Sequence, residues 1–352
     1  MSQKPSSSKR IIALDYLRGF FITVIIIDHL WRWPNIFASI SGRGELWASA
    51  AEGFVIISGL LVGYIRGYKN RKIPLKDVSK KLITRGILLY TWMIITSIVL
   101  VTVSWQFEFK GDMAYIPIDA GDWNTLITST LRFDYVHTLT HFLYLYAIFL
   151  VISPIVIWLE RQGKSWIVAA ASIALWLFGV MDNVEWMQWQ LLFFLPSIVG
   201  FYFETILAYY HKLTLRTRLW IRYGSIAVMA ATVFASAVII LPHDPGAYKD
   251  TLFGRDPVTL PTIIVSFIWF IGLLSLFQLI LPWLQKWFGW LLLTFGERSL
   301  TAYIVHTIPL VICQLFFTES DNFWLNSVLT LACILGTWAI LKIPYINKLI
   351  PR

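Results

Sequence analysis

The chain has 352 residues, of which 57% are hydrophobic and 14% are charged. Soluble domains average about 25% charged residues, so this composition excludes a soluble domain and indicates a polytopic membrane protein. The formal charge of +9 reflects the basic loops expected of membrane topology and does not indicate nucleic-acid binding. Both cysteines, Cys313 and Cys333, lie in apolar stretches, which predicts neither a disulfide framework nor a metal site.

Hydropathy predicts an all-α integral membrane protein with ten transmembrane helices in a single domain, residues 1–352. The predicted spans are 12–32, 46–65, 84–105, 142–159, 165–181, 188–209, 219–242, 260–282, 298–317 and 324–342. The predicted outer segments hold few basic residues, namely Arg32, Arg43, Lys110, Arg132, Lys249 and Arg255. Most basic residues therefore lie inside, which places both the N- and C-termini in the cytoplasm.

Three shorter segments complete this predicted topology. Residues 1–10 are expected to form a cytoplasmic tail, and residues 107–141 a long extracytoplasmic loop. The loop contains Trp123 and several aspartates, which would suit sugars through stacking and hydroxyl hydrogen bonds, although an ordinary acidic exterior loop has a similar composition. The Trp-rich stretch 284–296 is predicted to be an interfacial helix rather than a span.

The first predicted span carries ionisable residues within an otherwise apolar run. Each costs roughly 2.5–3.5 kcal/mol at membrane depth, so each needs a partner or a function. Arg18 and His29 lie about 20° apart around an α-helix and about 16 Å apart along it. One helix face therefore presents a cation near its inner end and an imidazole deeper in. Asp15, three residues before Arg18, is expected to pair with it.

Further candidates follow along the chain. Glu52, early in the second span, should face the bundle interior and orient His29, whereas Ser58 and Gly59 are expected to allow close helix packing. Lys81 and Arg85 end a basic inner loop, which would concentrate a phosphorylated donor or serve only orientation and anionic lipid contact.

Two later stretches add imidazoles. His141 opens the fourth span near the outer face, and His306 lies in the ninth span with Tyr303 on the same side. Imidazole titrates near neutral pH and is the commonest general base, which makes these residues candidates for proton transfer. The alternative for His141 is an interfacial histidine in contact with water, and the alternative for His306 is a packing hydrogen bond between helices.

Four stretches together resemble the OpgC-type membrane acyltransferases and the related acyltransferase family 3. They are LDYLRGFFITVIIIDH, AAEGFVIISGLLVGY, HFLYLYAIFLVISP followed by WQLLFFLPSIVG, and FGERSLTAYIVHTIPL. The first carries the Arg-x10-His pattern of the family, matched here by Arg18 and His29. Before the fourth span this chain has His141 where OpgC-type chains tend to have Asp-x-Leu-Pro, which is closer to the family 3 pattern.

The resemblance implies a multi-pass enzyme of the cell's inner (plasma) membrane that moves an acyl group from cytoplasmic acyl-CoA, as acetyl-CoA or succinyl-CoA, to a sugar hydroxyl. The partners would be a periplasmic or cell-surface glycan and the lipid bilayer, with no metal and with the oligomeric state open. On this interpretation the catalytic residues are His29, Glu52, His141 and His306, and the donor-binding residues are Arg18, Lys81, Arg85 and Tyr303. The alternatives are a secondary transporter or flippase that uses the buried charges as a relay, or a structural partner in polysaccharide export.

Overall fold

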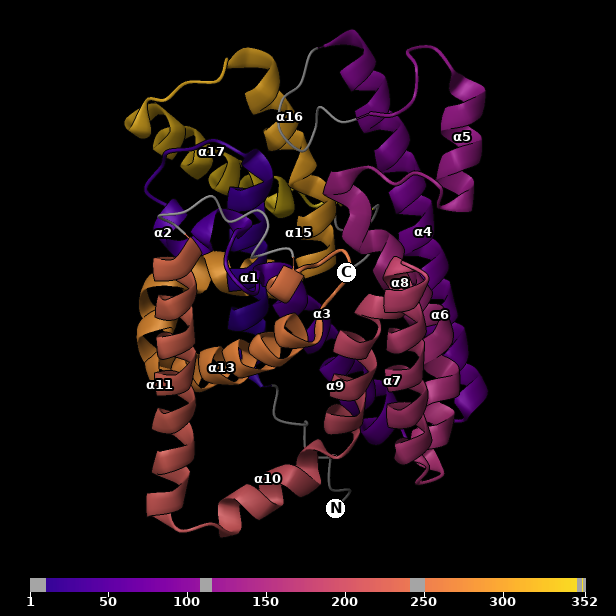
Figure 1. Ribbon diagram of the computed structural model, residues 1–352, viewed down its shortest axis with the longest axis vertical. Helices are drawn as coiled ribbons and strands as arrows, with labels where there is room; N and C mark the ends of the chain where they lie inside the picture. Colours follow the sequence, from indigo (N-terminus) through magenta and orange to yellow (C-terminus); the bar gives the residue numbers. More distant parts are fainter. Residues whose placement is uncertain (1–10, 108–115, 241–250, 347–349, 351–352) are drawn as a thin grey trace.

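The computed structural model describes residues 11–107, 116–240, 251–346 and 350, and across these ranges the chain forms helices and turns without a β-strand (Figure 1). The helices are α1 (Ile12–Leu30), α2 (Ala38–Ser41), α3 (Ala50–Leu61), α4 (Leu75–Gln106), α5 (Trp123–Arg132), α6 (His141–Arg161), α7 (Ser165–Met181), α8 (Glu185–Trp189), α9 (Leu191–Phe201), α10 (Phe203–Lys212), α11 (Leu215–Ile240), α13 (Leu260–Phe288), α14 (Thr294–Glu297), α15 (Ser299–Val305), α16 (Thr307–Phe316) and α17 (Phe323–Lys342). Shorter helical turns of the 3-10 type are Gly42–Gly44 and Thr138–Thr140, and π-helices are Val62–Lys69 and Gly289–Leu293.

Seven helical stretches in the described residues are long and apolar enough to cross a membrane, whereas the sequence predicts ten spans. They are Ala50–Lys69, Leu75–Gln106, Thr138–Arg161, Leu215–Ile239, Leu260–Glu297, Ser299–Phe316 and Phe323–Lys342. The other three predicted spans coincide with helices that fall outside this set. Helix α1 contains three charged residues, and α7 has only 17 residues. Helices α9 and α10 belong to a pair that is bent by 62°. The total of ten spans and the cytoplasmic termini stay predictions.

Helix α1 lies inside the bundle, while α4, α6 and α7 pack side by side on one flank and α11 packs on α13 at the other (Figure 1). Close backbone contacts hold α1 against the segment that follows α13. A Cβ at Gly19 would overlap the carbonyl group of Leu292, and a Cβ at Gly296 would overlap that of Asp15. Small residues at both positions therefore allow these backbones to touch.

The stretch 284–296 continues α13 instead of forming a separate helix. Helix α13 ends at Phe288, and the π-helix Gly289–Leu293 connects it to α14. Leu292 and Phe295 are buried against the bundle, because this stretch packs on α1. The second half of the stretch 284–296 is thus buried in the bundle, and its interfacial position in the membrane stays a prediction.

Glycines also bring α3 and the following π-helix Val62–Lys69 close to α9. A Cβ at Gly59 would overlap the carbonyl group of Phe193, and one turn later a Cβ at Gly63 would overlap that of Ser197. Helices in membranes associate through such small residues because lipid supplies no hydrophobic drive between them. The close packing predicted at Gly59 is therefore present.

We expect Gly63→Ala to lower the stability of the protein by about 1–3 kcal/mol, the usual cost of overpacking a tight contact. The added methyl group meets the backbone of Ser197, which cannot rotate away as a side chain can. Thermal unfolding of the detergent-solubilised protein measures the effect. The matched control is Gly224→Ala in α11, where a Cβ meets nothing within 4 Å. Equal unfolding temperatures for the two variants would contradict the tight α3–α9 contact.

Candidate active site

Two histidines from distant parts of the chain meet inside the bundle. His29 lies in the last turn of α1, and His306 lies at the junction of α15 and α16. Nδ1 of His29 is 2.9 Å from Nε2 of His306, and the ring centroids are 5.2 Å apart. His306 is fully buried, whereas His29 is partly exposed. The pair therefore has one fully enclosed member, His306, and one partly exposed member, His29.

The hydrogen bonds of the pair fix its tautomers. Nδ1 of His306 faces the backbone carbonyl oxygen of Tyr303, which accepts hydrogen bonds and cannot donate them, so this nitrogen carries a proton. In a neutral imidazole the other nitrogen is then an acceptor, so Nε2 of His306 accepts from the Nδ1–H of His29. Nε2 of His29 is left with a lone pair. The neutral pair thus presents a single basic nitrogen, on the residue that is partly exposed.

Tyr303 connects this pair to the start of α6. Its ring centroid lies 5.1 Å from that of His306 and 6.2 Å from that of His29. Its hydroxyl group accepts a hydrogen bond from the backbone N–H of Phe142 at 3.3 Å, an amide in the first turn of α6 that has no intrahelical partner. Tyr303, predicted as a donor-binding residue, therefore lies beside the histidines.

Two further imidazoles lie close enough to His29 to act on it electrostatically, namely His137 and His141. Nε2 of His141 lies 2.8 Å from Oε2 of Glu185, and both side chains are about one third exposed. Nδ1 of His137 accepts from the backbone N–H of Leu139 at 3.2 Å, which makes it part of the turn that precedes α6. Four imidazoles thus converge on one region. Glu185 was missed by the sequence analysis because nothing in the sequence relates α8 to His141.

Arg18 also points into the bundle. Its guanidinium group donates a hydrogen bond to Oγ of Ser299 and lies 5.8 Å from the ring centroid of Phe54. It is half-buried between α1, α3 and α15. The cation that the sequence places on the His29 face of α1 therefore lies against the same helix, α15, that leads to His306.

A series of aromatic rings lies between Arg18 and the histidine pair. The centroid of Phe142 is 4.8 Å from that of Phe54, which Arg18 covers, and 5.4 Å from that of Tyr303, which contacts both histidines. Phe142 also lies 5.5 Å from Tyr146, one turn further along α6. Phe54, Phe142 and Tyr303 are buried and pack edge to face, so they form a continuous aromatic contact from Arg18 to the histidine pair.

A cavity of about 720 Å³ lies among the basic residues that follow α3. It is lined by Arg66, Ile73, Asp77, Lys80, Lys81, Thr84, Arg85 and Leu88. The structure thus brings Lys81 and Arg85, the two predicted donor-binding residues, to one cavity and adds Arg66, which lies within electrostatic range of both Arg85 and Tyr146. Arg161 shapes the rim, because its guanidinium group donates to the backbone carbonyls of Arg66, Asn70 and Ile73.

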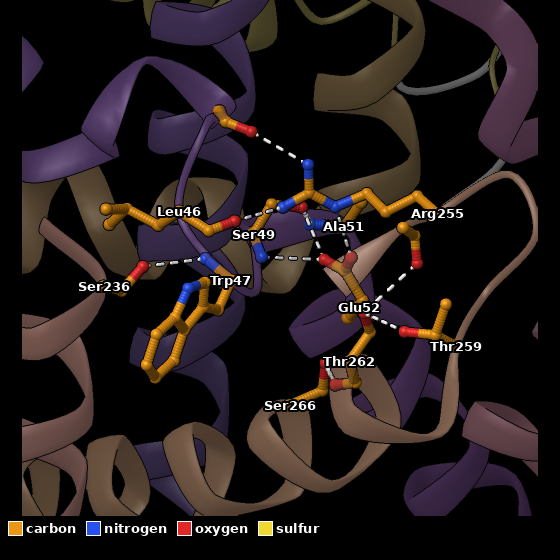
Figure 2. Close-up of polar contacts among 12 residues, drawn as sticks. Leu46, Trp47, Ser49, Ala51, Glu52, Ser236, Arg255, Thr259, Thr262 and Ser266 are labelled. Carbon is orange, nitrogen blue, oxygen red and sulfur yellow. Dashed lines mark hydrogen bonds and ion pairs between the residues drawn. The ribbon is translucent and has the colours of Figure 1, made fainter. Parts of the chain in front are cut away.

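The structure gives Glu52 different partners from the one expected. Figure 2 shows the guanidinium group of Arg255 between the carboxylate of Glu52 and the backbone of Leu46. Nε of Arg255 is 2.7 Å from Oε1 of Glu52, and the backbone N–H of Ser49 donates to Oε2 at 2.8 Å. Ser49 and Glu52 form a capping box at the start of α3. Both carboxylate oxygens are thus engaged away from His29, and His306 supplies the orienting contact instead.

Arg255 extends this contact to the connection between α1 and α3. Besides Glu52, it donates to the carbonyl oxygens of Gly44 and Leu46, each at 2.9 Å. Glu52 is fully buried and the side chain of Arg255 is 24% exposed, so the ion pair is largely removed from solvent. The pair therefore fixes the connection between α1 and α3 and the turn that contains Arg255 relative to α3. Among the residues the structure describes, no group of three or more His, Cys, Asp or Glu is placed to hold a metal ion.

The comparisons with known proteins identify one family. The family model described as OpgC protein matches residues 10–345, which is almost the full chain. No curated protein and no solved structure matches the chain. The helices that are apolar enough to cross a membrane fit a multi-pass membrane protein. The chain therefore belongs to the OpgC family, whose members are membrane acyltransferases that modify glycans.

Proposed function

We propose that this protein is an O-acyltransferase that uses cytoplasmic acyl-CoA, as acetyl-CoA or succinyl-CoA, to acylate a sugar hydroxyl of a periplasmic or cell-surface glycan. The observation that carries the proposal is the His29–His306 pair, whose hydrogen bonds leave Nε2 of His29 as the basic nitrogen. The site would lie in the inner membrane, with donor and acceptor arriving from opposite sides.

In this mechanism Nε2 of His29 removes the proton of the sugar hydroxyl as the hydroxyl oxygen attacks the thioester carbonyl carbon. The new C–O bond forms, the C–S bond breaks, and the leaving thiolate takes the proton back from His29. His306 accepts a hydrogen bond from the Nδ1–H of His29 throughout, which stabilises the imidazolium that forms between the two proton transfers. The carboxylate of a Ser-His-Asp triad holds its histidine in the same way.

The donor would enter through the basic cavity and Arg18. Guanidinium groups bind phosphate oxygens in bidentate fashion, which suits Arg66 and Arg85 for the nucleotide end of CoA. The acyl-bearing arm would then run past the aromatic rings of Phe54, Phe142 and Tyr303 to His29. The distance of about 16 Å along α1 between Arg18 and His29 is comparable to an extended arm of this kind.

The rival proposal, a transporter or flippase, expects broken helices in corresponding halves of the chain. The described helices contain one bent pair, Glu185–Phe201 with Phe203–Lys212. A single bent pair does not indicate the repeat architecture of a transporter. The hydrogen-bonded histidine pair fits acyl transfer better than it fits transport.

The direct test is loss of thioester from acyl-CoA by the purified protein in lipid nanodiscs, with and without a glucan. An acyltransferase gives acceptor-dependent thioester loss and an equal amount of O-acyl ester on the glucan. Absence of glucan acylation under conditions in which the protein is folded and binds acyl-CoA would overturn the proposal.

We expect Lys81→Ala and Arg85→Ala each to weaken acyl-CoA binding about tenfold, because a charge-assisted contact to phosphate contributes about 1.4 kcal/mol or more. Titration of the purified variants with a non-hydrolysable acyl-CoA analogue measures the affinity. Lys72→Ala is the matched control, since Lys72 belongs to the same basic loop but does not line the cavity. Equal affinities for all three variants would mean that the basic loop serves membrane orientation and does not bind the donor.

A further inference from the structure

An apolar cavity of about 500 Å³ lies between α11 and the centre of the bundle. Phe21 and Val24 of α1 and Gly53 of α3 line it on one side, and α11 lines it on the other. Trp269 of α13 completes the lining. The cavity shares no lining residue with the basic donor cavity, and neither member of the histidine pair lines it. It is therefore separate from the candidate active site.

Contacts with α13 and with the connection between α1 and α3 fix the position of α11. The indole N–H of Trp269 donates to Oγ1 of Thr232 at 2.9 Å. The backbone N–H of Trp47 donates to Oγ of Ser236, also at 2.9 Å, as Figure 2 shows. A Cβ at Gly272 of α13 would overlap a side chain of α11. Helix α11 therefore cannot move toward α1 and fill the cavity without breaking these contacts.

The mouth of the cavity lies on an apolar surface. Phe234 and Ile40, which both line the cavity, are 70% and 53% exposed. The helical stretches Leu215–Ile239 and Leu260–Glu297, which contribute to the lining, are apolar enough to cross a membrane, and only 11% of the most apolar part of the first is buried. A span with so little protein around it faces hydrocarbon in a bilayer. The cavity therefore opens toward lipid chains.

Water is a poor occupant of this cavity. The hydroxyl groups in the lining belong to Ser41, Ser49 and Ser266, and each already has a hydrogen-bond partner within the protein. A buried water needs about two to four polar partners, so an apolar cavity of this kind stays dry. An empty cavity would leave its walls without dispersion contacts on one side. A hydrocarbon chain supplies these contacts, and the volume falls within the range of about 300–1,000 Å³ that is usual for ligand pockets.

We infer that this cavity binds one acyl chain of a bilayer phospholipid. The chain enters past Phe234 and Ile40 and packs on the rings of Phe21 and Trp269. The headgroup stays outside the apolar lining, so binding depends on the length of the chain and not on the charge of the headgroup. The bound chain fills the space between α11 and the helices α1 and α3 and so stabilises their packing. This lipid site goes beyond the proposed function and does not depend on acyl transfer.

The first test compares lipids on the full-length protein, purified in detergent and stripped of lipid. The probes are dioleoyl phosphatidylglycerol, dioleoyl phosphatidylcholine and dihexanoyl phosphatidylcholine, and native mass spectrometry measures the binding of each. The two dioleoyl lipids are expected to bind one tight site with similar affinity. Dihexanoyl phosphatidylcholine is expected to bind at least about tenfold more weakly, because its short chains bury much less apolar surface.

The second test fills the cavity from α11. Ala230 lines the cavity, whereas the next residue, Ala231, is exposed on the same helix and does not line it. Ala230→Phe is expected to weaken dioleoyl lipid binding about tenfold or more, the usual effect of a misfit in an apolar pocket, and Ala231→Phe is the matched control. Added lipid should raise the unfolding temperature of the wild type and of Ala231→Phe by a few degrees and leave that of Ala230→Phe unchanged. Ala237→Phe, also in the lining, gives the same readout if Ala230→Phe does not fold.

Three results would overturn the lipid site. The first is equal lipid affinity in Ala230→Phe and Ala231→Phe, with equal lipid-dependent shifts in unfolding temperature. The second is equal affinity for the short-chain and long-chain phosphatidylcholines, which would indicate a headgroup site. The third is a lipid-free dimer that dissociates in Ala230→Phe, which would place a second copy of the chain over the cavity.

Discussion

Replacement of His29 by alanine is expected to reduce glycan acylation by about 10²–10⁴-fold, the usual contribution of a positioned general base. The protein should remain folded, because His29 is partly exposed and its removal leaves the α1 contacts at Gly19 in place. Acceptor-dependent thioester loss and thermal unfolding, measured on the same preparation, separate activity from stability. His211→Ala is the matched control, since His211 is an exposed histidine in α10.

Variants of His306, the hydrogen-bond partner of His29, test the same mechanism in a second way. His306→Ala removes the acceptor for the Nδ1–H of His29 and should lower kcat, whereas His306→Gln supplies a carbonyl oxygen as a substitute acceptor and should recover part of it. Recovery by glutamine identifies His306 as a positioning residue. A wild-type rate for His29→Ala would contradict the assignment of His29 as the general base. Equal rates for His306→Ala and His306→Gln would contradict the orienting role of His306.

The second large effect concerns stability. Glu52→Gln is expected to lower the free energy of unfolding by about 3 kcal/mol, the lower end of the range for breaking a buried ion pair, because Arg255 is left without its charge partner. Arg255→Gln should produce a similar loss. Thermal unfolding of the detergent-solubilised variants measures both.

The matched comparison is Glu185→Gln, which changes the more exposed contact between Glu185 and His141 and should change stability by about 1 kcal/mol or less. If Glu52→Gln unfolds at the wild-type temperature but transfers no acyl group, Glu52 is a catalytic residue, as the sequence predicts, and its contact with Arg255 is incidental. If both Glu52→Gln and Arg255→Gln unfold early, the carboxylate serves the fold.

The sequence predicts those parts of the site that depend on helical geometry alone. The placement of Arg18 and His29 on one face follows from 3.6 residues per turn, and the interior position of both follows from the cost of charge in a membrane. The grouping of Lys81 with Arg85 is likewise local. Membership of the OpgC family, expected from four short resemblances, is confirmed over residues 10–345.

Contacts between distant segments lie beyond such reasoning. The partner of His29 is 277 positions away and the partner of Glu52 is 203 positions away, and no periodicity relates these pairs. Glu52 is buried, as predicted for an acid early in a span, but its carboxylate is held by Ser49 in a capping box and by Arg255, and neither contact was predicted from the sequence. The tryptophans of the stretch 284–296 predict an interfacial helix, but nothing in the sequence indicates that Leu292 within it packs against Gly19 of α1.

The backbone contacts at Gly19 and Gly296 have a mechanical consequence. They hold α1 against the chain at Leu292 and again at Gly296, so a piston movement or rotation of α1 would drive backbone into backbone. The helix that carries Arg18 and His29 therefore acts as a stationary conduit and not as a rocking gate. If α1 stays in place during turnover, its charged residues do not move across the bilayer, and we expect the proposed acyl transfer to show no voltage dependence that arises from motion of this helix.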